Sequence, residues 1–324
     1  MVDGCDPQRS RGLTDSTSQL DGWPRVAVVG AGAVGGYFGG LLALAGAPVV
    51  LIARPAFVDA VNRDGLFLDT LQFQKSVHLE ATTDFVAVRG ADLVLFCVKT
   101  VDNAATARAI APLLGPETLV VGLHNGVDNA EQIRAAAQIN ILPAVVYIAA
   151  SVEKPGCIKH VGRGDLVLSA RDLGARRVAE IFTRANIPCR LSDNIEGELW
   201  TKLIWNCALN AISALARVRY GEIARNPEAR KLVRAAVEEV LAVAHAANVV
   251  LPDVASSEAA LAGAMKIATQ MPEAFSSTAQ DIHRGKLTEI DSLNGYIARR
   301  GAALGVPTPV NHTLFTLVKM LEGR

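Results

Sequence analysis

The chain has 324 residues and balances 32 Lys and Arg against 32 Asp and Glu, so its formal net charge is zero. This balance offers no electrostatic case for binding nucleic acid or an anionic membrane surface, and it favours a small-molecule partner. The length exceeds one typical hydrophobic core, and 50% of the residues are hydrophobic, so two domains are predicted.

Cysteine and histidine usage limits the chemistry further. The five cysteines are scattered singly with no C-x-x-C pair, which is typical of reduced thiols in a cytoplasmic protein. The six histidines show no metal-ligand spacing, so no metal site is predicted.

No targeting signal is predicted in the N-terminal region. Residues 1–22 are polar and lack an apolar segment, which predicts a disordered extension. Residues 26–53 carry no charge and are long enough to suggest a membrane span, but seven glycines and Pro48 interrupt them. A buried strand–helix–strand unit explains this stretch better, so no membrane segment is predicted.

That unit contains a dinucleotide-binding motif. Gly30, Gly32 and Gly35 satisfy G-x-G-x-x-G between an apolar strand over 26–29 and a helix over 34–44. The first glycine allows a tight turn, the second leaves room for a pyrophosphate beside helix N–H groups, and the third lets helix and strand pack closely. The predicted cofactor-binding residues of this turn are Gly30, Ala31, Gly32, Ala33, Val34 and Gly35.

The end of the second strand bears on the choice of cofactor. This strand is predicted over 49–53 and is followed by Arg54. Proteins that bind NAD usually place an acidic residue near this point, whereas NADP-binding proteins accommodate the 2′-phosphate with arginine. Arg54 therefore favours NADP, although a solvated arginine at a strand end is the simpler alternative.

Two further buried strands end in polar residues. The strands are predicted over 93–98 and 119–123, and Lys99 and Asn125 follow them. Ligands of open α/β sheets bind beyond the carboxyl ends of the strands, so both side chains are expected at the cofactor cleft. An exposed lysine and an ordinary Asn-Gly turn explain the pattern equally well.

The remaining segments predict an α/β fold, with an N-terminal Rossmann-type doubly wound sheet followed by an all-helical C-terminal domain. The domains are expected at 23–192 and 193–324. The other strands are expected as a hairpin or edge segment within 66–83, one strand over 144–150, and short antiparallel strands over 157–161 and 166–169. Helices are expected from about 195, over 226–247, over 256–270, in two pieces across 276–303, and over 311–322.

The first C-terminal helix carries a polar stripe. Lys202, Asn206 and Asn210 are spaced at i, i+4 and i+8 and therefore project from nearly one face. Asparagine is a poor interior helix former, so two of them beside a lysine favour a functional stripe over a polar edge of a packing helix. Hydride addition to a ketone leaves an alkoxide that needs a proton, and Lys202 is the candidate acid because no histidine is recognisably placed for this role.

A second polar cluster occupies residues 276–291. On one unbroken helix Ser277 and Glu289 would lie about 18 Å apart and on different faces. Gly285 predicts a break that could fold them together. Taken alone, this segment is also typical of a solvated charged surface.

Together these motifs resemble the ketopantoate reductase (2-dehydropantoate 2-reductase) family, from Arg25 to the C-terminus. The matching segments are Gly-Ala-Gly-Ala-Val-Gly-Gly at 30–36, Cys-Val-Lys-Thr at 97–100, Asn125-Gly126, the helix from Trp200 to Asn210, and the serine, Gln-Asp and Thr-Glu-Ile-Asp motifs within 276–291. The resemblance implies NADPH-dependent reduction of ketopantoate to pantoate, on the route to pantothenate and coenzyme A. It also implies an active site in the cleft between the two domains, and a homodimer is left open.

The resemblance assigns a role to each matched residue. Lys202 is implied to be the acid, and Glu289 to orient the lysine and the substrate. The residues implied to bind substrate are Asn206, Asn210, Ser277 and Asn125. Beyond the glycine-rich turn, the residues implied to contact the cofactor are Arg54, Lys99, Asn125 and Glu289.

Two positions depart from the family pattern. His124 stands where many relatives have glutamine, and Ala274 stands where some carry a substrate-contacting asparagine. A reductase for another 2-oxo acid is therefore an open alternative, because the family includes paralogues with other substrates. A non-catalytic NADPH-binding regulator is a second alternative, but it would have no use for an acid beside the nicotinamide.

Overall fold

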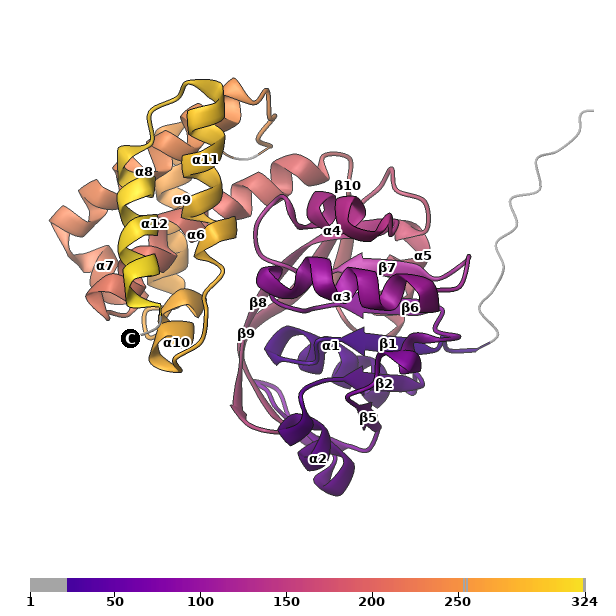
Figure 1. The fold of residues 1–324 in the computed structure, drawn as a ribbon. Helices are drawn as coiled ribbons and strands as arrows, with labels where there is room; N and C mark the ends of the chain where they lie inside the picture. Colours follow the sequence, from indigo (N-terminus) through magenta and orange to yellow (C-terminus); the bar gives the residue numbers. More distant parts are fainter. Residues whose placement is uncertain (1–21, 253, 255, 323–324) are drawn as a thin grey trace, which may run out of the picture.

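The computed structural model describes residues 22–252, 254 and 256–322. An α/β half formed by the N-terminal part of the chain lies beside a helical half formed by the C-terminal part (Figure 1). This arrangement confirms the predicted fold class. The extension predicted over residues 1–22 lies outside the described residues except for Gly22.

The α/β half is built on a parallel sheet. Six strands pair in parallel in the order β5-β2-β1-β6-β7-β8, which is the strand order of dinucleotide-binding domains. The strands are β1 (Val26–Val29), β2 (Val49–Ile52), β5 (Glu80–Thr82), β6 (Leu93–Phe96), β7 (Leu119–Gly122) and β8 (Ile141–Lys154). The continuous apolar runs of β1, β2 and β6 are buried throughout, as both-faced coverage of a parallel sheet requires.

The sheet continues past β8 through an antiparallel return. The added strands are β9 (Cys157–Ser169), which pairs with β8, then β3 (Leu66–Asp69) and β10 (Cys189–Ser192) on β9, and β4 (Gln74–Val77) on β3. The predicted hairpin within 66–83 is confirmed as β3 and β4. The segments predicted as antiparallel strands over 157–161 and 166–169 do pair antiparallel with β8, but the break predicted between them is wrong, because β9 runs unbroken past Gly162 and Gly164. The pairing of β9 with β8 changes register along this stretch, as it does at β-bulges, and the strand therefore continues through the two glycines.

Helices cover both faces of the sheet. They are α1 (Ala33–Leu44), α2 (Pro55–Asp64), α3 (Asn103–Ile110), α4 (Asn129–Ala137) and α5 (Ala175–Arg184), with 3-10 turns η1 (Phe85–Val88), η2 (Thr100–Asp102) and η3 (Ala111–Leu113). Phe38 of α1 and Phe182 of α5 belong to one buried cluster, whereas Ile110 of α3 and Ile133 of α4 belong to another. The sheet is therefore doubly wound.

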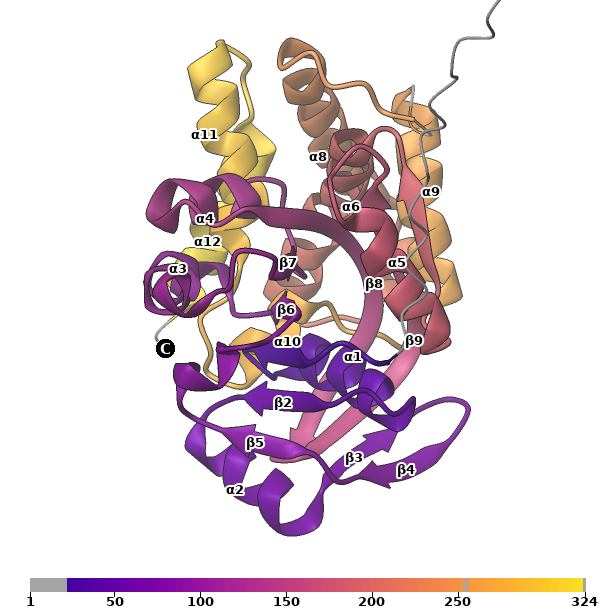
Figure 2. The ribbon, with the colours of Figure 1, turned by 90° about the vertical axis from the view of Figure 1, so that its right-hand side faces the viewer.

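The helical half has its own core around α6. Its elements are α6 (Ile195–Ala216), α7 (Tyr220–Arg225), α8 (Pro227–Ala246), α9 (Ser257–Gln270), α10 (Ser277–His283), η4 (Ile290–Ser292), α11 (Asn294–Leu304) and α12 (Pro309–Leu321). Asn194 and Asn226 cap α6 and α8 with side-chain hydrogen bonds, as their positions predict. Figure 2 shows the long strands β8 and β9 curving past α6, which contacts both. Among the described residues, no helix is long and apolar enough to cross a membrane.

Candidate functional site

The glycine-rich turn is pinned between three strands. The N–H groups of Gly30 and Ala31 both donate to the Ile52 carbonyl at 3.0 Å, which ties the turn to β2. Gly30 has φ +89°, and a Cβ there would lie 2.7 Å from the backbone nitrogen of Val98. A Cβ on Gly35 would lie 2.8 Å from Val28 of β1, so these two positions require glycine for the predicted reasons.

The same turn leaves an open space at the N-terminus of α1. A Cβ on Gly32, the N-cap residue, would meet only the Gly30 oxygen at 4.0 Å. The first amides of a helix have no acceptor within it, so α1 offers N–H groups to an anion there. Arg54 is exposed at the N-cap of α2, just beyond the end of β2. These residues fit a dinucleotide.

Just beyond the end of β7 and beside β8, Lys202 joins the two halves of the molecule. Its ammonium donates to Asn125 Oδ1 at 2.8 Å and to the Val146 carbonyl of β8. Asn125 Nδ2 donates in turn to Glu289 Oε2 at 2.9 Å. The predicted acid, the predicted carboxylate and the predicted Asn125 are therefore one hydrogen-bonded group, with Asn125 bridging the two charges.

The environment of Lys202 suits an acid that works near neutral pH. Burial lowers the pKa of Lys202 to about 8, and the negative charge of Glu289 opposes that shift. A general acid is most effective when its pKa is close to the working pH. An ammonium has three donors, and Asn125 and Val146 take two, so one remains for a ligand.

A buried network behind Asn125 holds it in place. Asn129 Nδ2 donates to the Asn125 carbonyl at 2.6 Å, while its Oδ1 accepts from Asn103 at 2.8 Å. The Thr100 hydroxyl lies 2.9 Å from Asn129 Oδ1 and 3.4 Å from Glu289 Oε1. Asn103 is 0% and Asn129 4% exposed. Sequence reasoning missed both asparagines, which stand at helix starts where such residues are common.

The side chain of Lys99 also links the two halves of the molecule. Its ammonium lies 2.8 Å from Asp281 Oδ1 and donates to the Leu287 carbonyl at 2.7 Å. Burial raises the pKa of Asp281, and the bond with Lys99 opposes this. The lysine that sequence reasoning expects at the cofactor cleft thus ties the loop after β6 to the segment around α10.

The rest of the polar stripe continues along α6 toward α10. Asn206 is partly exposed, and Asn210 is buried with its Oδ1 accepting from the Tyr220 hydroxyl at 2.9 Å. Ser276 donates to the Asn210 carbonyl at 2.9 Å, which places the exposed Ser277 at the start of α10 next to the stripe. The predicted break is confirmed, because α10 ends at His283 and Gly285 has φ +61°.

Aromatic residues border Lys202 on the β8 side. The Tyr147 ring centroid lies 5.9 Å from the Lys202 ammonium and 6.5 Å from the Trp205 ring. The Arg163 guanidinium lies 3.8 Å from the same Tyr147 centroid and is held by a bidentate bond to Asp165. Trp205 lies one turn after Lys202 on α6. This spacing is the feature of the sequence from which aromatic residues near Lys202 could have been predicted.

His124 is not an alternative acid. It is 8% exposed and lies against Phe96, with ring centroids 5.5 Å apart. Burial lowers the pKa of His124 to about 4, so the imidazole is neutral near pH 7. Among the described residues, no group of three or more His, Cys, Asp or Glu could hold a metal ion.

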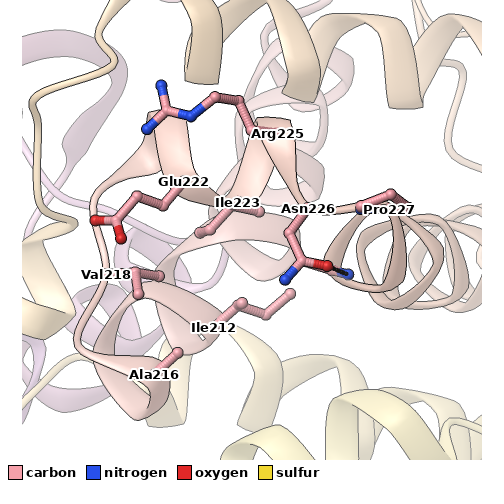
Figure 3. Close-up of a pocket in the computed structure, with 9 residues that line it drawn as sticks. Ile212, Ala216, Val218, Glu222, Ile223, Arg225, Asn226 and Pro227 are labelled. Atoms are coloured by element: carbon pink, nitrogen blue, oxygen red, sulfur yellow. Dashed lines mark hydrogen bonds between the residues drawn. The ribbon is translucent and has the colours of Figure 1, made fainter.

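A separate surface pocket lies near the C-terminal end of α6 (Figure 3). It has a volume of about 580 Å³ and contains none of the predicted site residues. Its lining residues are Ile212, Ala216, Val218, Glu222, Ile223, Arg225, Asn226, Pro227 and Ala229. Glu222 and Asn226 cap helices there, so these two polar side chains serve local structure.

A turn shaped for a dinucleotide, combined with a lysine held between an amide and a carbonyl, fits a nicotinamide-dependent oxidoreductase. The family model for ketopantoate reductase PanE/ApbA matches residues 26–172, and the model for its C-terminal region matches 194–322. The chain therefore belongs to the ketopantoate reductase family of oxidoreductases.

Individual relatives align along nearly the whole chain. The 2-dehydropantoate 2-reductase of Archaeoglobus fulgidus is 31% identical over 303 residues, covering 92% of this chain and 98% of the relative. The PanE/ApbA family ketopantoate reductase of Ralstonia eutropha JMP134 is 47% identical with a TM-score of 0.86, covering 92% of this chain and 98% of that one. A D-mandelate dehydrogenase in complex with NADH and anilino(oxo)acetate is 26% identical with a TM-score of 0.85 and the same coverage.

Proposed function

We propose that this protein reduces 2-dehydropantoate (ketopantoate) to pantoate with NADPH, using Lys202 as the general acid. The observation that carries the proposal is the hydrogen-bonded group of Lys202, Asn125 and Glu289 at the junction of the two halves. Relatives named 2-dehydropantoate 2-reductase support this substrate. Family membership also supports a cytoplasmic enzyme of pantothenate and coenzyme A biosynthesis, with domains over 23–192 and 193–324.

The residues of the α/β half fit the cofactor. Bound nicotinamide supplies a hydride to the ketone carbon. The pyrophosphate would be held by the turn of Gly30, Ala31, Gly32, Ala33, Val34 and Gly35. Arg54 would pair with the 2′-phosphate, because its exposed guanidinium follows β2. Lys99, Asn125 and Glu289 would lie on the nicotinamide side.

Lys202 would supply the proton. One N–H of its ammonium would be left for the ketone oxygen, because Asn125 and Val146 take the other two. As negative charge develops on the ketone oxygen, the ammonium stabilises it and transfers the proton. Glu289 favours the protonated lysine before each turnover, because its charge raises the pKa that burial lowers.

The polar stripe would recognise the rest of the substrate. Ketopantoate carries a carboxylate and a terminal hydroxyl in addition to its ketone. Asn206, Asn210 and Ser277 offer amide and hydroxyl groups along α6 and at the start of α10. A site that bonds a substrate hydroxyl rejects an analogue without it, because its own polar groups are left unpaired.

The test is the oxidation of NADPH with ketopantoate and with 2-oxoisovalerate, which lacks the hydroxymethyl group. We expect kcat/KM for ketopantoate to be higher, by up to ~10⁴-fold. Comparable values for the two acids would reject ketopantoate as the substrate and leave a general 2-oxo-acid reductase.

A second candidate is a reductase of aryl 2-oxo acids. Tyr147 and Trp205 beside Lys202 favour it, because aromatic rings pack well against an aryl group. The similarity to the D-mandelate dehydrogenase structure points the same way. Phenylglyoxylate included in the substrate panel decides between the two: a kcat/KM above that of ketopantoate selects the aryl substrate.

A further inference from the structure

The side-chain amide of Asn210 is held in one orientation by a residue outside the polar stripe. Asn210 is 4% exposed, and its Oδ1 accepts a hydrogen bond from the Tyr220 hydroxyl at 2.9 Å. Tyr220 is itself 8% exposed and begins α7, with its backbone N–H donating to the Ala274 carbonyl at 3.0 Å. Both members of the pair are thus fixed by the packing of the helical half.

The pair leaves the amide with an unused donor. Among the described residues, Asn210 Nδ2 has no hydrogen-bond partner, yet it is not one of their fully enclosed unpartnered atoms. It therefore keeps contact with open space. Burial raises the pKa of Tyr220, so its phenol is protonated and can donate a hydrogen bond near neutral pH. A phenol that donates to Oδ1 keeps the NH₂ group of the amide for a ligand.

Ser276 fixes the backbone of the same residue. Its hydroxyl donates to the Asn210 carbonyl at 2.9 Å and accepts from the Ala279 N–H at 2.9 Å, so it joins α6 to α10. The backbone and the side chain of Asn210 are therefore held by separate partners. An asparagine that is held at both its backbone and its side chain can discriminate between ligand groups, because its side-chain amide cannot rotate to suit an incorrect one.

We propose that Tyr220 is a positioning residue for substrate recognition, which turns the Asn210 NH₂ group toward the terminal hydroxyl oxygen of ketopantoate. The inference rests on the proposed function. Asn210 is the member of the stripe farthest along α6 from Lys202, by about 12 Å of helix rise. We assign to it the terminal hydroxyl, which is the polar group of the substrate that lies farthest from the ketone.

The test compares ketopantoate with 2-oxoisovalerate in the wild type and in Tyr220→Phe, which removes only the hydroxyl. The measured quantity is the ratio of the two kcat/KM values. In the variant the Asn210 amide is free to flip, so we expect the ratio to fall about tenfold, mainly through a higher KM for ketopantoate. Tyr296→Phe is the matched control, because among the described residues the Tyr296 hydroxyl has no hydrogen-bond partner, and it should leave the ratio unchanged.

The outcomes separate this inference from the function on which it rests. A wild type that prefers ketopantoate and a Tyr220→Phe variant with the same ratio overturn the inference and leave the function standing. An equal loss on both acids, mainly in kcat, shows a structural role and also overturns it. A wild type without preference overturns both. If Tyr220→Phe does not fold, a crystal structure of the wild type with pantoate decides, and an Asn210 Nδ2 that faces away from the pantoate hydroxyl rejects the inference.

Discussion

The cofactor side of this molecule is formed mainly by backbone groups, whereas the substrate side is formed by side chains. The turn between β1 and α1 is made of backbone, with the N–H groups of Gly30 and Ala31 bonded to one carbonyl of β2. The group around Lys202 is made of side chains from distant segments. Lys202 is 77 residues from Asn125, and Asn125 is 164 residues from Glu289.

Because of this difference, the two sides should be sensitive to different kinds of substitution. A backbone site tolerates most side-chain changes nearby but no added Cβ at Gly30 or Gly35, where a neighbour lies within 3.0 Å. A side-chain site depends on both halves of the molecule, since Asn125 belongs to one half and Lys202 and Glu289 to the other. Binding of the cofactor and chemistry on the substrate should therefore be separable by mutation.

The largest separation is expected from Lys202→Ala. Removal of the general acid should lower kcat by at least ~10²-fold, while the Kd of NADPH changes little. Steady-state turnover and NADPH titration by fluorescence measure the two quantities. Lys231→Ala, at an exposed site on α8, is the matched control and should keep full activity. Nearly intact turnover in the Lys202 variant would place the acid elsewhere.

Arg54→Ala should produce the opposite pattern on the cofactor side. A guanidinium that pairs with the 2′-phosphate contributes only to NADPH, so we expect kcat/KM for NADPH to fall about tenfold to a hundredfold and that for NADH to stay constant. Arg63→Ala, at the exposed end of the same helix α2, controls for loss of a surface charge. Equal use of NADPH and NADH by the wild type would refute the NADP assignment.

Asn129→Ala tests whether the buried network behind Asn125 serves the chemistry. The change removes the donor that holds the Asn125 carbonyl at 2.6 Å, so we expect kcat to fall about tenfold with little effect on NADPH binding. It also leaves Asn103 without an acceptor, which lowers Tm. Gln132→Ala on the same helix α4 is the control, because among the described residues its side-chain amide bonds only to Asp128. A lower Tm with unchanged kcat would limit Asn129 to a structural role.

The same contrast explains what could be predicted from the sequence. The turn depends on neighbouring residues, so the strand, the glycines and the helix are recognisable from local pattern alone. The stripe of Lys202, Asn206 and Asn210 follows from helical periodicity, and the break at Gly285 follows from glycine chemistry.

The missed features all depend on contacts between distant segments. Asn103 and Asn129 stand at helix starts, and only tertiary packing brings their amides together. Tyr147 lies in an apolar strand and therefore resembles a core residue until β8 is placed beside α6. The continuity of β9 depends on register shifts against β8, which no local pattern encodes.

The smallest expected effect is also the most specific, because it concerns the sign of a pKa shift. The ammonium form of Lys202 is the acid, so kcat/KM for reduction should decline as the pH rises through about 8. Burial lowers this pKa, the charge of Glu289 raises it, and the charge of Arg163 lowers it. Glu289→Gln should therefore move the declining limb to lower pH, and Arg163→Gln should move it to higher pH. Profiles of kcat/KM against pH for the three proteins measure both shifts. Displacement of the two limbs in the same direction would show that the lysine does not govern the profile, even if Lys202→Ala were inactive.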